Sequence, residues 1–166
     1  MTLDPTLILD PTRDLELFRS IAASPALVWR CWTEPALICQ WFCPKPWYVS
    51  EAVVDLRAGG RFFTLMNGPD GEKMPNEGSF LEVVPQSRIV FTDMMAADFA
   101  PVAVPESGAG LSFVAILTFA PTAKGTDYRA VVRHRSAADA DLHRQMGFHE
   151  GWMAAAGQLE DLARTL

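Results

Sequence analysis

Residues 136–166 have the sequence SAADADLHRQMGFHEGWMAAAGQLEDLARTL, and their pattern decides the fold class. Apolar side chains recur at helical spacing along this stretch and form one broad stripe. The stripe consists of Leu142, Met146, Trp152, Met153, Ala156, Leu159, Leu162, Ala163 and Leu166. Asp139 and Asp141 near the start and Arg164 near the end suit the dipole of a helix. The stretch therefore predicts one long amphipathic helix whose apolar side covers another hydrophobic surface.

Strand-like segments make up most of the chain before this helix. We expect strands at 14–21, 47–57, 61–67, 73–84, 88–95, 111–120 and 126–135, short helices at 25–33 and 36–42, and a loop at 97–110. Ser24 and Pro25 mark the start of the first helix, because serine caps helices and proline suits their first position. Short turns such as Gly59-Gly60 join most successive strands, and such connections make antiparallel pairs.

The fold class that follows is α+β, a curved antiparallel sheet of six or seven strands around a long C-terminal helix, with two short helices after the first strand. A twisted sheet of this width has to curl round a single helix, and the curl leaves room for a cavity between them. The 166 residues fit one domain, which we place at 14–166 after an N-terminal arm at 1–13.

Composition and charge exclude several classes of protein. Fourteen basic and twenty acidic residues give a net charge of −6, and the basic residues do not cluster, so we expect no nucleic-acid partner. No apolar run approaches the roughly 20 residues of a membrane helix, so no membrane partner is expected. The first eleven residues hold two aspartates and lack the basic region of a signal peptide. We therefore expect a cytoplasmic protein with reduced cysteines.

Several short stretches together resemble a known family. They are SPALVWR (24–30) with WTEP (32–35), QWF (40–42), DLRAGG (55–60), Met66 with GPDG (68–71), GSFLEV (78–83) with Pro85 and Arg88, GT (125–126), and GW (151–152) with Leu159. In this order and spacing, the chain from residue 14 onward resembles the START-like helix-grip (SRPBCC) superfamily, in the branch named after the activator of the ninety-kilodalton heat-shock ATPase.

The resemblance implies a seven-stranded sheet that grips the C-terminal helix. Members of the superfamily include lipid carriers, polyketide cyclases and co-chaperone domains, so the resemblance is specific for fold rather than for function. The chain departs from the family pattern at Ala156 and Ala163, where leucine is usual, and in the length of the loop 97–110. Smaller side chains at these two positions would enlarge the cavity or admit a second subunit, and a homodimer stays open.

A small apolar molecule is the ligand that this cavity predicts, because aromatic and methionine side chains adapt to varied apolar shapes. The candidate ligand-binding residues are Trp41, Phe42, Phe62, Thr64, Met66, Phe80, Phe91, Tyr128, Val132, His134, Met146, His149, Trp152 and Met153. Of these, Trp41 and Phe42 are expected at the cavity mouth. The alternative is an ordinary filled core made of the same residues.

Catalysis and metal binding have weaker support. His134 or His149 with Asp93 could serve as acid or base in a cyclase- or hydrolase-type enzyme, but no nucleophile–base pair is visible. Cys31, Cys39 and Cys43 lack the second ligand pair of a zinc site. We expect no metal and no cofactor. A co-chaperone-like module that regulates an ATPase, with a chaperone partner, stays open as the alternative to ligand binding.

Overall fold

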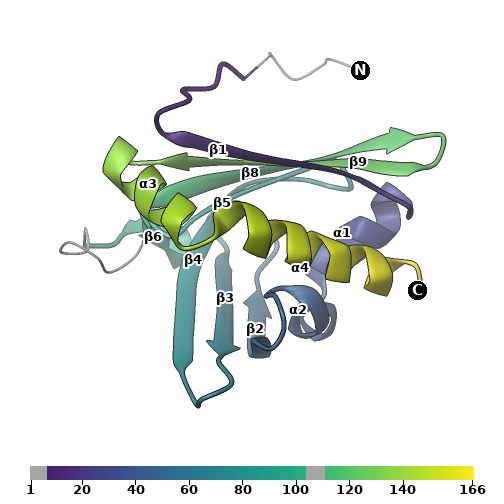
Figure 1. Ribbon diagram of the computed structural model, residues 1–166, viewed down its shortest axis with the longest axis horizontal. Coiled ribbons are helices and arrows are strands. Elements are labelled where there is room, and N and C mark those ends of the chain that lie inside the picture. The colour runs from purple at the N-terminus through teal and green to yellow at the C-terminus, as the bar shows by residue number, and fades with distance from the viewer. Residues whose placement is uncertain (1–6, 104–110) are drawn as a thin grey trace.

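A seven-stranded antiparallel sheet wraps around the C-terminal helix in the computed structural model, which describes residues 7–103 and 111–166 (Figure 1). The strands lie in the order β1-β9-β8-β5-β4-β3-β2. Their bounds are β1 (Asp14–Ile21), β2 (Tyr48–Val54), β3 (Arg61–Asn67), β4 (Lys73–Val84), β5 (Arg88–Thr92), β8 (Phe113–Thr122) and β9 (Gly125–His134). Within the described residues the α-helices are α1 (Pro25–Thr33), α2 (Pro35–Trp41), α3 (Ala137–Gln145) and α4 (Phe148–Ala163). The predicted α+β fold class is confirmed.

The predicted elements agree with the observed ones in type and mostly in bounds. The strands expected at 14–21, 61–67 and 73–84 match residue for residue, as does the first helix. Beyond β5 the chain forms a small hairpin of β6 (Met95–Ala96) and β7 (Ala100–Pro101) around a 3-10 turn, η1 (Ala97–Phe99). The strand expected at 88–95 thus ends at Thr92, and the hairpin takes up its last residue and the start of the expected loop 97–110. Residues 104–110 of that loop lie outside the described part of the chain.

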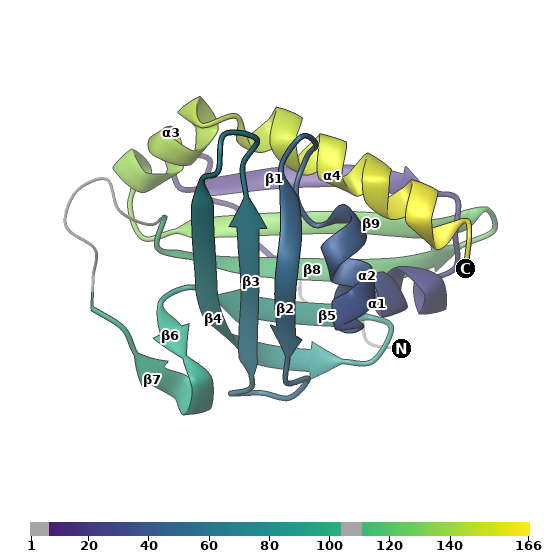
Figure 2. The ribbon, with the colours of Figure 1, turned by 90° about the horizontal axis from the view of Figure 1, so that it is seen from below.

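The sheet is strongly curved, so that β2, β3 and β4 run across the direction of β1, β8 and β9 (Figure 2). The register shifts between Val49 and Glu51 in β2, and again between Phe80 and Glu82 in β4. Such irregularities bend a strand and increase its twist. Gly78 precedes the second shift, and a Cβ there would lie 2.4 Å from the carbonyl oxygen of Thr92. The strands themselves therefore carry the curvature that the fold requires.

The C-terminal helix differs from its prediction as one continuous element, because Gly147 divides it into α3 and α4. Gly147 has a φ of 89° and a ψ of 39°, the left-handed conformation that glycine adopts without steric cost. The Ser136 hydroxyl caps α3 by accepting a hydrogen bond from the N–H of Asp139 at 3.1 Å. The two helices consequently point in different directions: α3 packs against β9 and β1, and α4 crosses the concave face of the sheet (Figure 1).

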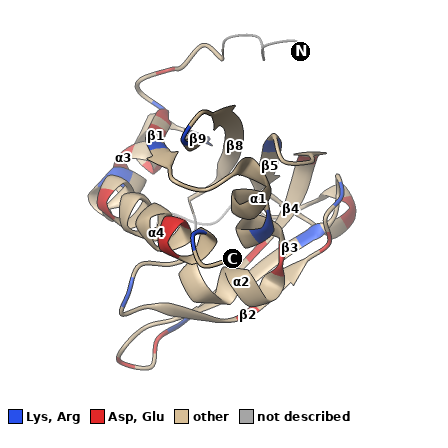
Figure 3. Cartoon of the chain, turned by 90° about the vertical axis from the view of Figure 1, so that its right-hand side faces the viewer, with Lys and Arg blue, Asp and Glu red and all other residues tan. Residues whose placement is uncertain are grey.

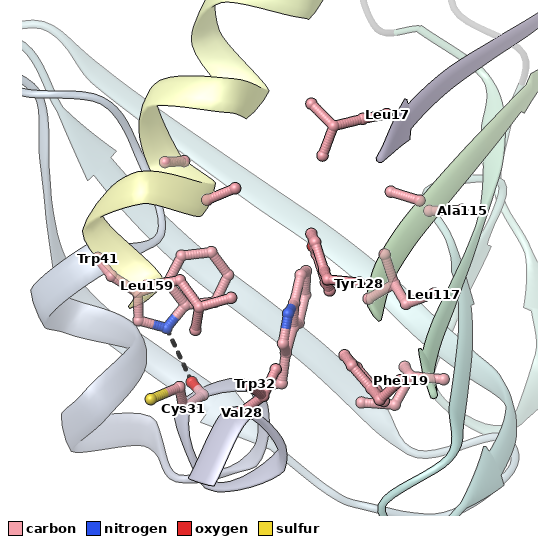
Figure 4. Close-up of a cluster of buried hydrophobic side chains, with 14 of the residues drawn as sticks. Leu17, Val28, Cys31, Trp32, Trp41, Ala115, Leu117, Phe119, Tyr128 and Leu159 are labelled. Atoms are coloured by element: carbon pink, nitrogen blue, oxygen red, sulfur yellow. Dashed lines mark hydrogen bonds between the residues drawn. The ribbon is translucent and has the colours of Figure 1, made fainter. Parts of the chain in front are cut away.

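The hydrophobic core lies where α1, α4 and strands β8 and β9 meet (Figure 4). Val28, Leu117 and Leu159 are all fully buried there. The indole N–H of Trp41 donates to the carbonyl oxygen of Cys31 at 2.9 Å, so a polar group that helix packing buries is satisfied inside the core. The two short helices thus close one end of the space under the sheet.

Gln158 of α4 joins the terminal helix to the segment that follows α2. Its Nε2 atom donates to the carbonyl oxygens of Trp41 and Cys43, at 3.0 and 2.8 Å. Its Oε1 atom accepts from the N–H of Lys45 at 3.1 Å. One side chain therefore satisfies three backbone groups that have no ladder or helix partner at this bend, and it sets the distance between α4 and α2.

Charged side chains of both signs are distributed over the molecule (Figure 3). The arginines of β9 face solvent and pair with carboxylates of the adjacent strand, as in the contact of Arg129 with Glu16 at 3.0 Å and of Arg133 with Asp14 at 3.1 Å. None of the helices in the described ranges has the length and apolar character needed to cross a membrane.

Gly147→Ala is expected to lower the free energy of unfolding by about 1 kcal/mol, because alanine adopts the left-handed conformation only with strain. An added Cβ would meet only a carboxylate oxygen of Glu150, at 3.8 Å, so the cost comes from the backbone and not from a clash. Gly157→Ala is the matched control inside α4, where alanine is expected to add about 0.5–1 kcal/mol. Urea denaturation measures both; destabilisation of equal size in the two variants would contradict the break at Gly147.

Gln158→Ala is expected to lower the free energy of unfolding by about 1–3 kcal/mol, because it leaves two carbonyl oxygens and one N–H at the bend without partners. Gln40→Ala is the control, since Gln40 is exposed and makes one hydrogen bond within its own helix, to Ala36 at 3.2 Å. Its change should stay within about 0.5 kcal/mol. Thermal and urea unfolding compare the two variants. Equal stabilities would contradict a stabilising role for the hydrogen bonds that Gln158 makes between α4 and the segment after α2.

Candidate ligand-binding cavity

A cavity of about 610 Å³ lies between α4 and the concave face of the sheet. Strands β3, β4, β5, β8 and β9 form its sheet side, and α1, the end of α2, α3 and α4 form its helix side. Cavities that hold small molecules in proteins measure roughly 300–1,000 Å³ and are lined mainly by apolar and aromatic groups. The space that the sheet curvature predicts is therefore present and is large enough for a small molecule.

Nine of the residues predicted to bind a ligand lie in the cavity wall. They are Trp41, Phe42, Phe62, Thr64, Met66, Phe91, Tyr128, Met146 and Trp152. Phe62, Thr64 and Met66 alternate along β3, and the strand period places their side chains on the helix side. Met146 lies at the rim, where 61% of it is exposed. Trp41, expected at the mouth, is instead almost fully buried within α2.

The other five predicted residues lie outside the wall. They are Phe80, Val132, His134, His149 and Met153. Phe80 and Val132 are fully buried in the core behind the wall, because strand alternation specifies a face but not a depth. His149 and Met153 are exposed on the outer side of α4. Both lie about a quarter turn or more around α4 from the middle of its buried face, which Ala155, Ala156 and Leu159 form.

Small residues on α4 keep the helix side of the cavity open. Gly151, Ala155 and Ala156 all lie in the wall. Ala156 is one of the two positions where the family usually carries leucine. The other, Ala163, is fully buried in the core and is not part of the wall. Of these two alanines, therefore, only Ala156 enlarges the cavity.

A row of aromatic rings follows the sheet side of the cavity. Trp32 and Phe91 have ring centroids 6.0 Å apart, and Phe62 packs edge-on against Phe91 at 5.0 Å. Phe113 continues the row, 6.0 Å from Phe91 and 6.1 Å from the imidazole of His143. A ring with a polar atom therefore stands at each end of this row: the indole of Trp32 at one end and the imidazole of His143 at the other.

His143 is a wall residue that the sequence reasoning did not select. Its Nδ1 atom lies 2.9 Å from Nε2 of His134, and Nδ1 of His134 lies 2.9 Å from the carbonyl oxygen of Arg13. His134 faces the helices, as alternation in its strand predicts, and His143 stands between it and the cavity. Burial, and then the neighbouring His134, lower the pKa of His143 to about 4. A buried imidazole is thus held uncharged beside the cavity.

Tyr128 and Trp32 form the polar group at the other end (Figure 4). Complete burial raises the pKa of the Tyr128 phenol, and the neighbouring indole N–H of Trp32 partly offsets that rise. This N–H is buried and makes no hydrogen bond of good geometry with any described residue. A buried donor without an acceptor costs about 1–3 kcal/mol, and the nearest polar group to this one is the phenol of Tyr128.

Asp93 is the acidic group that the sequence reasoning paired with a histidine. It lies in the wall, and its two carboxylate oxygens accept hydrogen bonds from the N–H groups of Phe113 at 2.8 Å and Ser112 at 3.2 Å. Burial raises the pKa of Asp93, and these backbone hydrogen bonds oppose the rise. Its contacts are with the start of β8 rather than with an imidazole.

The three cysteines are all free thiols. Burial raises the pKa of Cys31 and of Cys43 to about 11, so these thiols stay protonated and unreactive at neutral pH. Within residues 7–103 and 111–166, no group of three or more histidine, cysteine, aspartate or glutamate side chains could hold a metal ion.

Comparisons with known proteins agree with this architecture. Among solved structures, a protein from Nitrosomonas europaea is 43% identical, with a TM-score of 0.88 and coverage of 95% of this chain and 97% of its own. A protein from Mycobacterium smegmatis is 26% identical, with a TM-score of 0.75 and coverage of 92% and 91%. The AHSA1-like protein from Aeromonas hydrophila, at 19% identity, a TM-score of 0.70 and coverage of 92% of each chain, shares the fold. No curated protein matches the chain.

The model of one protein family matches residues 22–164, which include all four helices described above and every strand of the large sheet except β1. That family is described as "Activator of Hsp90 ATPase homolog 1-like protein". It is the branch of the START-like superfamily that the sequence motifs resemble. The chain therefore belongs to the family of activator of Hsp90 ATPase homolog 1-like proteins.

Proposed function

We propose that the protein binds a small, largely apolar molecule in the cavity between α4 and the sheet. The observation that carries this proposal is a cavity of about 610 Å³ whose wall is mostly aromatic and aliphatic, with a smaller number of polar residues. Most protein interiors are close-packed, and an unfilled space of this size forfeits dispersion contacts that a filled core would make. Retention of such a space, with glycine and alanine where larger residues would fill it, favours binding.

A catalytic role for the cavity histidines has less support. His149 lies on the exposed side of α4, and His134 is separated from the cavity by His143. Both oxygens of Asp93 accept backbone hydrogen bonds, and no described contact joins Asp93 to a histidine. General acid–base catalysis requires a proton donor and acceptor within hydrogen-bond reach of the reacting group. Binding without an assigned reaction is therefore the function that we propose.

The co-chaperone-like alternative has a different kind of support. The family description refers to activation of the Hsp90 ATPase, and no feature of the described surface adds to that description for this chain. The cavity, in contrast, is built from this chain's own residues. We therefore give ligand binding priority over an interaction with a chaperone.

Ala155→Phe is expected to abolish binding of a neutral apolar dye, N-phenyl-1-naphthylamine, because the new ring would occupy the cavity. Ala155 is buried in the wall, so a side chain added there points into the space that the dye needs. Fluorescence titration of the wild-type protein should give saturable binding of one dye per chain. The variant should lose at least about tenfold in affinity, which corresponds to 1.4 kcal/mol.

Ala154→Phe is the matched control, since Ala154 is the neighbouring residue on the exposed side of α4. This variant should bind the dye as the wild-type protein does. Circular dichroism and thermal unfolding establish that both variants are folded. Equal dye affinity in all three proteins would place the dye elsewhere and refute the proposal, as would the lack of saturable binding to the wild-type protein.

A further inference from the structure

The two buried histidines form a hydrogen-bond chain with a fixed direction. The carbonyl oxygen of Arg13 can only accept, so Nδ1 of His134, 2.9 Å away, must carry a hydrogen and donate it. In a neutral His134, Nε2 is then an acceptor. The Nδ1 atom of His143, 2.9 Å from that acceptor, must therefore carry the hydrogen of this second bond.

Charge on this pair is disfavoured by its surroundings. His134 and His143 are only 5% and 7% exposed. Besides His134, the rings packed against His143 are Phe113 of β8 and Phe148 and Trp152 of α4, and none of these three carries charge. No carboxylate contacts either imidazole among the described residues, and an unpaired buried charge is costly. An unpaired charge on either ring is therefore disfavoured by burial, and burial lowers the pKa of His143.

The direction of the chain determines what His143 presents to the cavity. A neutral imidazole that carries its hydrogen on Nδ1 has a lone pair on Nε2. This Nε2 atom has no hydrogen-bond partner among residues 7–103 and 111–166, although the imidazole lines the cavity. One end of an apolar cavity thus holds a fixed hydrogen-bond acceptor, and only a donor can satisfy it.

The charges in the wall add a second constraint. Glu77 and Asp93 line the cavity, whereas its described wall contains no lysine or arginine. Arg61, the cation that pairs with Glu77 at 2.7 Å, stacks over the ring of Phe63 and is not part of the wall. A carboxylate or phosphate ligand would enter a space that offers it no counter-charge and an acceptor where it needs a donor.

We infer that the cavity selects neutral apolar molecules that carry a hydroxyl or N–H group, and that this group donates a hydrogen bond to Nε2 of His143. The inference rests on the proposed ligand-binding function and adds the chemical class of the ligand. His134 acts as a positioning residue, because it holds the His143 ring in the tautomer that accepts.

Four probes with one ring system test this selection: 2-naphthol, 2-methoxynaphthalene, naphthalene and 2-naphthoate. Calorimetric titration should show that His143→Phe weakens 2-naphthol about five- to tenfold, because one buried hydrogen bond is lost. Affinities for naphthalene and 2-methoxynaphthalene, which lack a donor, should change less than about twofold, because phenylalanine keeps the ring contacts. The wild-type protein should bind 2-naphthoate at least about tenfold more weakly than 2-naphthol, since no cation in the wall offsets its buried charge.

The controls separate this inference from the proposed function. His149→Phe alters an exposed histidine and should leave every affinity unchanged. If no neutral probe binds the wild-type protein, the proposed function fails together with the inference. If the neutral probes bind and His143→Phe weakens them all equally, or if 2-naphthoate binds as tightly as 2-naphthol, the selection of donors is overturned while the binding function stands.

Nitrogen-15 NMR of the wild-type protein gives a test that does not depend on the variant's folding. The chain has three histidines, so their ring nitrogens are few enough to assign. The expected result is a hydrogen on Nδ1 of both His134 and His143, with a shift of the His143 Nε2 resonance when 2-naphthol binds. A hydrogen on Nε2 of His143 in the free protein would overturn the inference.

The pH dependence of stability tests whether His143 is neutral in the folded protein. Its pKa is about 4 when folded and 6.5 in the unfolded chain, so the unfolded chain binds one more proton between these values. Stability should therefore fall as the pH decreases from about 6.5 toward 4, by up to about tenfold in the unfolding constant per pH unit relative to His143→Phe. Urea titrations at pH 7.5 and 5 measure the free energy of unfolding of both proteins. An equal change in the two proteins would mean that His143 is charged in the folded protein at pH 5.

Discussion

One helix has to cover the concave face of a seven-stranded sheet, and the rest of the structure follows from that constraint. The 16 residues of α4 make a helix about 24 Å long and about 10 Å wide. Seven strands span about 29 Å at their usual spacing, with strand lengths of up to 12 residues. A helix of this size cannot fill the concave side. The α1–α2 pair closes one end with aromatic side chains, and the space between this pair and α3 stays open as the cavity.

The placement of polar atoms in the cavity follows from how the elements meet around it. The break at Gly147 lets α3 turn toward β9, and this turn brings His143 onto His134. In the same way, α1 brings the Trp32 indole beside Tyr128 of β9. Each polar group is held by a different helix against the same strand. Binding specificity would therefore depend on helix positions that Gln158 and the left-handed glycine determine, and not only on the residues that touch a ligand.

The fold could be predicted from the sequence to a large extent, because its signals are local. Ser24-Pro25 marks the start of a helix through capping chemistry, and the alternation at 61–67 marks a strand through its period of two. The position of His143 could not be found in this way. Gly147 is compatible both with the interior of a helix and with its end, and the apolar stripe continues past it. The glycine after Met146 was the available signal for a helix end, because α3 then ends there and places its His143 against His134.

The strand period also does not show which side chains on the concave face line the cavity and which are covered by their neighbours. Phe62 and Phe80 both point to the concave side and stack with centroids 5.0 Å apart, yet only Phe62 lines the cavity. Curvature decides which of two such residues is covered by its neighbour, and the bulge at Phe80 is a property of paired strands rather than of one segment. Cavity shape therefore depends on contacts between segments far apart in the chain. For this reason, family membership predicts the architecture, while the hydrogen-bond direction set by Arg13, His134 and His143 is the better guide to what the cavity would accept.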